Sequence, residues 1–404
     1  MDALATPSNW QRVRLGDIAE IIGGGTPSTQ VASFWNGSIN WFTPTEIGIT
    51  KYVHKSQRTI TLLGLKKSSA KLLPIGTILL TSRASIGDCA ILKVVATTNQ
   101  GFQSLIPLEK INNEFLYYLM LTLKNKLLKL ASGSTFLEVS PNKIKNLLIP
   151  LPPLNEQIAI ANILSDVDHY LYTLDALILK KESVKKALRI KMLNQILASN
   201  GVEFRELGDI ILSLKTGLNP RSFFKLNTPN ANNYYVTIRE LEDYTIKFTH
   251  QTDRIDDNAL SLCLKRSNLE KDDILFSGTG TIGKVSIIEK NPNNWAIKEG
   301  IYSIKPNKKI VFPRFLMFCL ESSNIQNDIK NKSFGGIVKS IPMNDLQQIQ
   351  IPLPPLNEQI AIANILSALD SEIISLKNKK RQFDNIKKAL NHDLMSAKIR
   401  VLKK

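Results

Sequence analysis

Cysteine and histidine are scarce in this sequence, and the few that occur are scattered along the chain. Its 404 residues contain three cysteines and four histidines, namely Cys89, Cys263, Cys319, His54, His169, His250 and His392. Disulfide frameworks and zinc sites require clustered ligands at characteristic spacings, and no such cluster is present. We therefore expect buried, reduced cysteines and no metal site.

Long apolar runs and acidic residues are also few. No uncharged apolar run reaches the ~18 residues of a membrane-spanning helix, and residues 1–4 lack the basic-then-apolar pattern of a signal peptide. We therefore expect a soluble, cytoplasmic protein without a membrane partner. The chain has 52 basic against 35 acidic residues, a net charge of +17, and 43% hydrophobic residues. The apolar content is sufficient for folded cores, and the basic excess favours a polyanionic partner such as nucleic acid.

Sequence motifs of catalysis are missing or incomplete. Gly278, Gly280 and Gly283 match the G-x-G-x-x-G spacing of a nucleotide-binding loop, but such a loop must open a helix. The residues that follow, 285–288, have the composition of a strand, so we expect a strand–turn–strand hairpin instead. The chain has no Asn-Pro-Pro-Tyr-like tetrapeptide and no G-x-S-x-G elbow. We assign no catalytic residue and no metal ligand.

An internal repeat organises the whole chain. Residues 149–165 read IPLPPLNEQIAIANILS, and residues 351–367 repeat them without a change at an offset of 202. Weaker matches precede this one in the same order, for example the string LGDI at 15–18 and again at 207–210. The chain is therefore expected to hold two copies of one ancestral unit.

Each copy begins with about 150 residues of mixed character and continues with a helix. Short β-branched runs, frequent breaks and apolar helical stretches at 114–130 and 313–329 predict a compact α+β domain whose chemistry lies on loops. Beyond the Pro-Pro pairs, apolar residues recur at a 3.5-residue step, which is typical of a coiled coil. Acidic residues cluster at the start of each helix and basic residues at its end. Antiparallel pairing would place these opposite charges side by side.

The predicted fold class is thus α+β. It comprises two tandem-repeated α+β domains separated by two long α-helices, paired as an antiparallel coiled coil with pseudo-twofold symmetry. The expected boundaries are residues 1–150 for the first domain, 151–202 for the central spacer helix, 203–352 for the second domain and 353–404 for the C-terminal spacer helix.

The repeated string and its position resemble the specificity subunit of type I restriction-modification enzymes. Asn99-Gln100-Gly101-Phe102 also resembles a recurrent string of that family's recognition domains, whereas the second copy has Lys298-Glu299-Gly300-Ile301. The resemblance implies that each domain recognises one half of a bipartite site on double-stranded DNA. It also implies two methyltransferase (modification) subunits docked on the helices, and motor–endonuclease (restriction) subunits that complete the complex. The chain itself would hold no cofactor, because adenosylmethionine, ATP and magnesium would belong to the partner subunits.

Loop residues that can reach bases or phosphates are the candidates for DNA contact. In the first domain these are Thr26, Ser28, Thr45, Glu46, Ser82, Arg83, Ser85, Gln100 and Ser134. In the second domain they are Lys215, Thr216, Arg239, Ser277, Thr279, Lys284 and Lys298. Arg83 is the foremost candidate, because a guanidinium in a Ser-rich turn can bind guanine in bidentate fashion. The candidates for subunit docking and spacing are Pro153, Asn155, Glu156, Gln157, Ile160, Leu164, Pro355, Asn357, Glu358, Gln359, Ile362 and Leu366.

Two other functions remain open on the sequence. A self-sufficient DNA-modifying enzyme would need catalytic motifs that the chain lacks. A purely structural coiled-coil protein would account for the helices but not for two basic, loop-rich domains.

Overall fold

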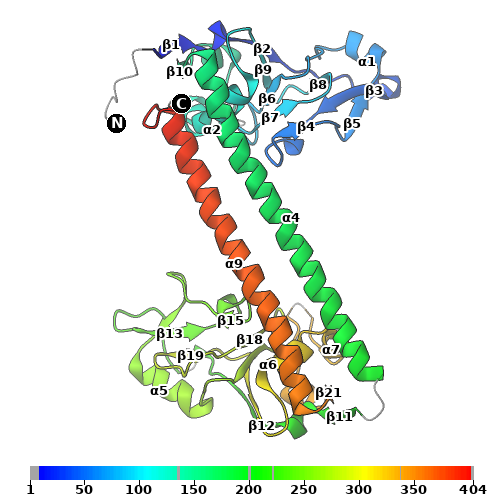
Figure 1. Ribbon diagram of the computed structural model, residues 1–404, viewed down its shortest axis with the longest axis vertical. Coiled ribbons are helices and arrows are strands. Elements are labelled where there is room, and N and C mark those ends of the chain that lie inside the picture. The colour runs from blue at the N-terminus through cyan, green and yellow to red at the C-terminus, as the bar shows by residue number, and fades with distance from the viewer. Residues whose placement is uncertain (1–8, 134–136, 199–201, 221–222, 337, 402–404) are drawn as a thin grey trace. The chain divides into compact units, whose positions relative to one another are not determined.

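The chain forms two compact units, each built from one mixed domain and parts of both long helices. The computed structural model describes residues 9–133, 137–198, 202–220, 223–336 and 338–401 (Figure 1). Unit 1 comprises Met1–Asp175 and Lys379–Lys404, and unit 2 comprises Ala176–Asn378. The helices α4 (Leu154–Ala198) and α9 (Leu356–Met395) are each divided between the two units.

The domain of unit 1 contains a five-stranded sheet and a three-stranded sheet. The first has the order β2 (Ala19–Gly23), β9 (Gln103–Pro107), β6 (Ile78–Leu80), β7 (Cys89–Leu92) and β4 (Tyr52–Val53). The second has the order β5 (Arg58–Ile60), β3 (Trp35–Phe42) and β8 (Ala96–Thr98). The helix α2 (Asn113–Leu130) buries Phe115 and Leu116 in one core with sheet residues such as Ile78 and Leu105. This helix confirms the apolar stretch that the sequence predicts at 114–130.

The remaining elements of unit 1 connect the domain to the helices. The strand β1 (Gln11–Arg14) pairs antiparallel with β10 (Leu148–Leu151), which leads directly into α4. Two short helices, α1 (Leu62–Lys66) and α3 (Pro141–Lys145), complete the domain.

The domain of unit 2 repeats this arrangement, except that its larger sheet has four strands and lacks a counterpart of β4. A four-stranded sheet has the order β12 (Ile211–Thr216), β20 (Ile301–Pro306), β17 (Ile274–Ser277) and β18 (Val285–Ile287). A three-stranded sheet has the order β16 (Arg254–Ile255), β13 (Asn233–Val236) and β19 (Trp295–Ile297). The pair of β11 (Glu203–Glu206) with β21 (Gln350–Leu353) corresponds to β1 with β10. The short pair β14 (Leu241–Glu242) and β15 (Thr245–Ile246), together with α5 (Asp257–Arg266) and α8 (Met343–Gln347), completes it.

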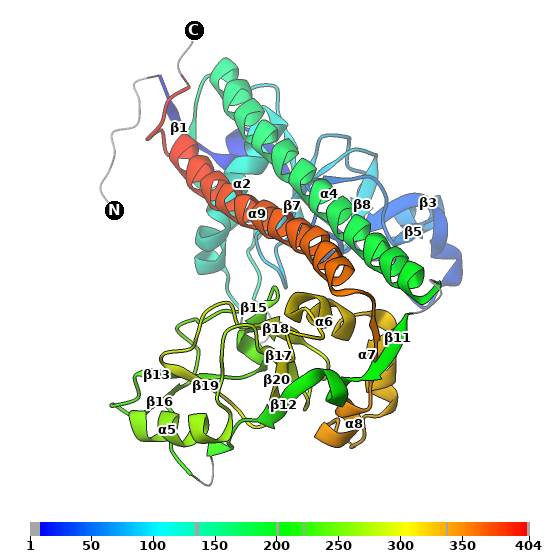
Figure 2. The same ribbon diagram turned by 60° about the horizontal axis from the view of Figure 1, so that its bottom comes forward.

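The stretch 313–329 forms two helices where the sequence predicts one. These are α6 (Pro313–Leu320), which lies against β18 in Figure 2, and α7 (Ser323–Asn331). Ser322 between them has the extended angles φ −64° and ψ 147°. The side chain of Gln326 donates to the Leu320 carbonyl at 2.7 Å, which satisfies an acceptor freed by the break. The prediction of a single helix is therefore wrong at this break.

The two long helices pair antiparallel within each unit. In unit 1, Asp175 binds Lys380 at 2.7 Å, Asp168 binds Lys387, and Glu156 binds Arg400 at 2.9 Å. In unit 2, the ion-pair distances are 2.7 Å for Glu182–Lys377 and 2.5 Å for Lys185–Asp370. In both units the residue number of the partner, on α9 or at Arg400 just beyond it, falls as the residue number on α4 rises. This confirms the predicted fold class, including the antiparallel helices and their acid-to-base pairing.

The seam between the helices is apolar, as the 3.5-residue step predicts. On α4 the buried seam residues are Ile160, Leu164, Leu171, Leu174 and Ile178. On α9, Lys380 and Lys387 interrupt the apolar repeat, and both are ion-paired with aspartates of α4. Among the described helices α9 alone is long and apolar enough to cross a membrane by composition, with a mean hydropathy of 1.3 in its most apolar window. In unit 2 it buries Ala363 and Leu366 in the core of the domain instead.

Candidate nucleic-acid interface

The turn between β6 and β7 is held by one hydroxyl group. The Thr81 hydroxyl donates to the Ser85 carbonyl at 2.6 Å and accepts from the Asp88 amide at 3.0 Å. Ala84 and Gly87 have φ angles of 55° and 89°, in the left-handed region that a tight turn uses. The turn thereby presents Arg83 and Ser85 at the end of the hairpin.

Unit 2 builds the same turn between β17 and β18. The Ser277 hydroxyl donates to the Thr281 carbonyl at 2.6 Å and accepts from the Lys284 amide at 2.8 Å. Gly280 and Gly283 have φ angles of 81° and 91° at the matching places. The strands that flank this turn pair antiparallel, so the predicted hairpin is confirmed. The glycines open no helix, and the nucleotide-loop geometry is absent from this segment.

A second turn packs against the first in each unit. The Ser82 amide donates to the Gly101 carbonyl at 2.8 Å, and the Gly278 amide donates to the Gly300 carbonyl at the same distance. Both turns therefore offer a glycine carbonyl to the hairpin of their own unit. They differ in detail, because Gly300 alone of the two glycines has a left-handed φ, of 86°, and Asn99-Gln100 in one unit is Lys298-Glu299 in the other.

In each unit a glycine from a third loop packs against the second turn. A Cβ atom on Gly24 would lie 1.9 Å from the Asn99 carbonyl oxygen, and one on Gly217 would lie 1.9 Å from the Ile297 carbonyl oxygen. Only glycine permits such a close approach of two backbones. The loops around residues 24 and 217 are thereby fixed beside the second turn of their own units.

A fourth segment brings one more side chain to each cluster. The Val139 amide donates to the Ser82 carbonyl at 3.1 Å, and the Ile341 amide donates to the Gly278 carbonyl at 2.9 Å. One residue earlier in the chain, Glu138 binds the Arg83 guanidinium at 2.8 Å. At the matching place in unit 2, the hydroxyl oxygens of Thr279 and Ser340 are 3.2 Å apart. We call these two assemblies loop cluster 1 (around residues 24–28, 82–85, 99–101 and 138) and loop cluster 2 (around 216–218, 278–280, 298–300 and 340).

Most of the candidate DNA-contact residues of the first domain lie in loop cluster 1. The Thr26 hydroxyl donates to the Gln100 side chain, and Ser28 is exposed. Thr45 is exposed beside Pro44, whose ring lies close against Gly101. The Glu46 carboxylate instead accepts from the backbone amides of Thr43 at 2.8 Å and Gln57 at 2.7 Å, so it holds its own loop. Ser134 lies outside the described residues.

In the second domain the candidates divide between loop cluster 2 and its surroundings. The Thr216 hydroxyl accepts from the Gly300 amide at 3.2 Å, and Lys298 and Thr279 are exposed beside it. Lys215 is exposed on β12 directly before Thr216. Lys284 donates to the Ile238 carbonyl at 3.2 Å, and the neighbouring Arg239 binds Asp253 at 2.6 Å. Lys284 and Arg239 therefore lie on a separate part of the domain surface.

Ser82 and Ser277 are buried, with exposed fractions of 1% and 0%. The Ser82 hydroxyl donates to the Gly101 carbonyl at 3.2 Å, and that of Ser277 holds its turn. Both hydroxyls are used by the backbone, so the proposed DNA-contact surface excludes these side chains.

Sequence reasoning missed the residues that the fourth segment supplies, chiefly Glu138 and Ser340. They follow Arg83 and Thr279 by more than fifty residues, so no local pattern joins them. Glu138 and Ser340 are 202 residues apart, the same offset as that between the two copies of the exact repeat. This equal offset is the one sequence signal that could have identified them as equivalent positions. Lys339 was missed as well; it is exposed, and its carbonyl accepts from the Gly280 amide at 2.8 Å.

Some residues at the start of α4 and α9 bond to their own domain, and others are exposed. The Gln157 side chain accepts from the Asn112 amide at 2.8 Å and donates to the Lys110 and Pro152 carbonyls at 3.1 and 2.9 Å. Gln359 makes the same three bonds in unit 2. These glutamines, with the buried Leu164 and Leu366, join each helix to its own domain.

Other residues of the repeat face solvent or differ between the copies. Pro153, Asn155, Pro355 and Asn357 are exposed, Ile160 is buried, and Ile362 is half-buried. Glu156 is buried and binds Arg400 and the Trp10 indole, whereas Glu358 is exposed. One sequence thus occupies two environments.

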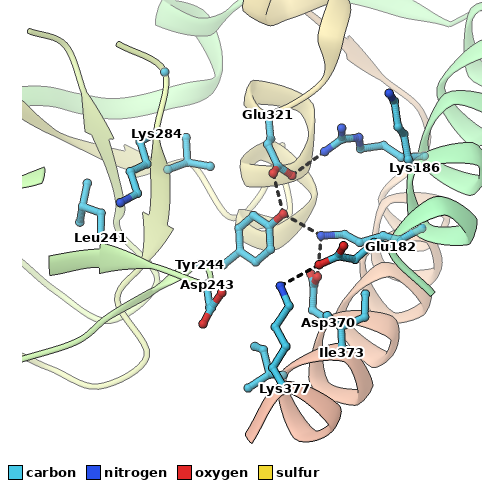
Figure 3. A pocket seen from close by; sticks show the side chains of 15 residues that line it. Glu182, Lys186, Leu241, Asp243, Tyr244, Lys284, Glu321, Asp370, Ile373 and Lys377 are labelled. Carbon is cyan, nitrogen blue, oxygen red and sulfur yellow. Dashed lines mark hydrogen bonds and ion pairs between the residues drawn. The ribbon is translucent and has the colours of Figure 1, made fainter. Parts of the chain in front are cut away.

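A polar network attaches the second domain to the helices. Lys185 binds Asp370 at 2.5 Å and donates to the Tyr244 hydroxyl at 2.7 Å. The Tyr244 hydroxyl donates in turn to Glu321 at 2.5 Å (Figure 3), and Glu321 binds Arg189. Burial first, and then the Glu321 carboxylate, raise the pKa of Tyr244 well above its usual value, so it remains protonated. These residues line a cavity of about 410 Å³ whose charges are largely paired.

The cysteines offer no reactive thiolate. All three are buried, and burial raises the pKa of Cys89 to about 12 and that of Cys263 to about 11. Protonated, inaccessible thiols are neither nucleophiles nor metal ligands at neutral pH. The part of the chain that the structure describes contains no group of three or more His, Cys, Asp or Glu able to hold a metal ion.

Two copies of one domain, alike in backbone and different in loop side chains, define a duplicated recognition protein. A family profile described as "Type I restriction modification DNA specificity domain" matches residues 7–181 and 199–383. The chain therefore belongs to the type I restriction-modification specificity family and carries two such domains.

Individual relatives agree with this assignment. The chain is 30% identical to the putative type I restriction enzyme MjaX specificity subunit of Methanocaldococcus jannaschii, over 98% of this chain and 95% of that protein. It is 42% identical to the MjaIX specificity subunit of the same organism, over 40% of this chain and 38% of that protein. The crystal structure of the type I S subunit from M. genitalium has a TM-score of 0.60, with 18% identity and 97% coverage of both chains, and shares the fold.

Proposed function

We propose that this chain selects the DNA target of a type I restriction-modification complex, with each domain recognising one half of a bipartite sequence. The observation that carries the proposal is the pair of loop clusters. In both clusters the hairpin turn is bonded through its backbone to a glycine turn and to the fourth segment, whereas the side chains that the clusters present differ in size and charge. A constant frame with variable side chains is what recognition of two different half-sites requires.

The proposed DNA-contact surface consists of the accessible candidates. In the first domain these are Thr26, Ser28, Thr45, Arg83, Ser85 and Gln100. In the second they are Lys215, Thr216, Thr279 and Lys298, with Arg239 and Lys284 as phosphate contacts beyond loop cluster 2. The net charge of +17 supplies the attraction to the phosphate backbone.

Two methyltransferase subunits are the proposed partners of the repeated helix starts. Leu154 and Ile158 are 45% and 42% exposed, and their counterparts Leu356 and Ile360 are 38% and 37% exposed. Each pair is four residues apart on one helix face, beside an exposed asparagine. Identical exposed apolar faces on both copies suit two identical partner chains.

Chemistry is proposed to belong to those partners. The methyltransferase subunits would use adenosylmethionine, and motor–endonuclease subunits would use ATP and magnesium. The chain itself is proposed to be non-catalytic and cytoplasmic, and its domain boundaries to follow the repeat at residues 150, 202 and 352.

Strand-resolved mapping of methylated adenines tests the proposal. In a strain that keeps the methyltransferase gene, genomes with and without this gene should differ in the methylation of one bipartite motif. A reconstituted complex should methylate that motif in vitro, and the purified chain alone should not. Methylation or cleavage by the chain alone would contradict the proposal and favour a self-sufficient enzyme. An unchanged methylome, with no DNA binding by the complex, would favour a structural protein.

A further inference from the structure

One position in each domain brings together two side chains from segments far apart in the sequence. In unit 1 these are Arg83 and Glu138, which form an ion pair of 2.8 Å. In unit 2 they are Thr279 and Ser340, with hydroxyl oxygens 3.2 Å apart. We call this place the paired position.

The backbone around the paired position is the same in both units. Arg83 forms an isolated antiparallel bridge with Glu138, and Thr279 forms one with Ser340. Glu138 also exchanges two backbone bonds of 3.0 Å with Ser132, as Ser340 does with Phe334 at 2.8 and 2.9 Å. The frame is therefore constant, and only the side-chain chemistry changes from one domain to the other.

The charged pair remains accessible to a ligand. The side chains of Arg83 and Glu138 are 42% and 33% exposed, so both are partly accessible to solvent. A guanidinium has five N–H donors and a carboxylate about four acceptor sites, and one ion pair leaves most of them free. In the major groove, guanine presents the O6 and N7 acceptors, and its partner cytosine presents the N4 amino donor. Adjacent donor and acceptor groups on the protein match this edge.

We propose that Arg83 and Glu138 together recognise one G·C base pair of the first half-site, Arg83 at the guanine and Glu138 at the cytosine. Thr279 and Ser340 occupy the equivalent specificity-determining position for the second half-site. Their hydroxyls both donate and accept, so this position discriminates less between base pairs. The inference rests on the proposed function and adds the residues and the base pair.

The experiment uses the chain in complex with its methyltransferase subunit and the duplex target found by methylome mapping. Each guanine of the first half-site is replaced in turn by 7-deazaguanine, which lacks the N7 acceptor, and each cytosine by 2-pyrimidinone, which lacks the amino group. Wild-type complex should lose about 5- to 150-fold in affinity at one base pair, the range of one bidentate base contact. Arg83→Ala should become insensitive to 7-deazaguanine there, and Glu138→Ala to 2-pyrimidinone at the paired cytosine.

Two further variants separate base recognition from folding and charge. Arg83→Lys keeps the charge but loses the planar fork, and it should lose guanine discrimination while the complex still assembles. Arg205→Ala removes an arginine from another exposed Arg–Glu pair, Arg205–Glu203 at 2.7 Å, and should leave the pattern unchanged. The exchange Arg83→Thr with Glu138→Ser should relax one base pair of the first half-site only.

The outcomes distinguish this inference from the function on which it rests. A bipartite motif whose first half contains no G·C pair would overturn the inference alone. Equal sensitivity of wild-type and Arg83→Lys complexes to every base replacement would do the same. If the wild-type complex recognises no motif, the proposed function itself fails.

Discussion

At the scale of single residues, identity between the two repeats has more than one physical origin. Gln157 and Gln359 are buried and make the same three hydrogen bonds, so their own domains account for both. Glu156 is buried in an ion pair, whereas Glu358 is exposed. Folding accounts for the second glutamate only through the favourable interaction of a carboxylate in the first turn with the helix dipole, and it gives no reason for the exposed asparagines. Binding of the same partner twice, or exchange of DNA between the repeats, is left as the cause.

Asp273 carries a prediction about pH. Its carboxyl group is buried, and burial raises its pKa from an ordinary 3.8 to about 6, despite the hydrogen bond that it accepts from the Glu270 amide. The folded state therefore binds this proton more tightly than the unfolded state does, and stability falls as pH rises from about 4 to 6. Asp273→Asn should raise the free energy of unfolding by about 1–2 kcal/mol at pH 7.5, and the gain should vanish at pH 4.

Urea denaturation at both pH values measures this difference. The matched control is Asp272→Asn, because Asp272 is next in the chain and binds Lys308 at 2.6 Å on the surface. Its left-handed φ of 75° is tolerated by asparagine, so this variant should show no gain at pH 7.5. An equal gain for Asp273→Asn at pH 4 and pH 7.5 would show that ionisation is not its source.

At the scale of elements, the ion pairs between α4 and α9 differ in how deeply they are buried. Lys185–Asp370 in unit 2 has side chains only 10% and 14% exposed, whereas Lys380–Asp175 in unit 1 is 33% and 48% exposed. Removing one partner of a buried pair leaves an uncompensated charge. We expect Asp370→Ala to destabilise unit 2 by about 2–4 kcal/mol, measured by hydrogen exchange of its backbone amides.

Two controls locate the cause of that loss. Asp175→Ala should cost about 0–1 kcal/mol in unit 1, as solvent-exposed pairs do. The double change Lys185→Met with Asp370→Leu should recover most of the stability, since it removes both charges and puts apolar side chains in their place. Failure of this double variant to recover would mean that the Lys185 bond to Tyr244 carries the effect instead.

Some elements could be predicted from the sequence and others could not. The predicted ones are determined by neighbouring residues, and the others by contacts between residues far apart in the sequence. The helices α4, α9 and α2 and the β17–β18 hairpin were predicted because periodicity and turn chemistry are local. The break at Ser322 and the parallel pairs β3–β8 and β13–β19 were not, because they depend on distant partners. The same holds in the candidate interface. Arg83 was predicted from its turn, while Glu138 lies in another loop, and the burial of Ser82 depends on Gly101.

At the scale of the whole molecule, the basic excess is unevenly distributed and partly used within the chain. Residues 1–150 carry a net charge of +8 and residues 203–352 only +3. On the helices, Lys181, Lys185, Lys377, Lys380 and Lys387 are paired with acidic residues of the other helix. The helical lysines therefore stabilise the pairing, and phosphate attraction comes mainly from the first domain.

Duplication of the helix start predicts the stoichiometry of the complex. Leu154→Asp with Ile158→Asp should remove one of two methyltransferase subunits, Leu356→Asp with Ile360→Asp should remove the other, and all four changes should remove both. Aspartate at the first residue of each helix interacts favourably with the helix dipole, and all four positions are exposed, so α4 and α9 should remain folded. Native mass spectrometry of the reconstituted complex counts the subunits. Tyr172→Asp, at a 74% exposed position of α4 beyond the repeat, is the control and should keep both partners. Retention of two methyltransferase subunits by the fourfold variant would place docking elsewhere on the chain.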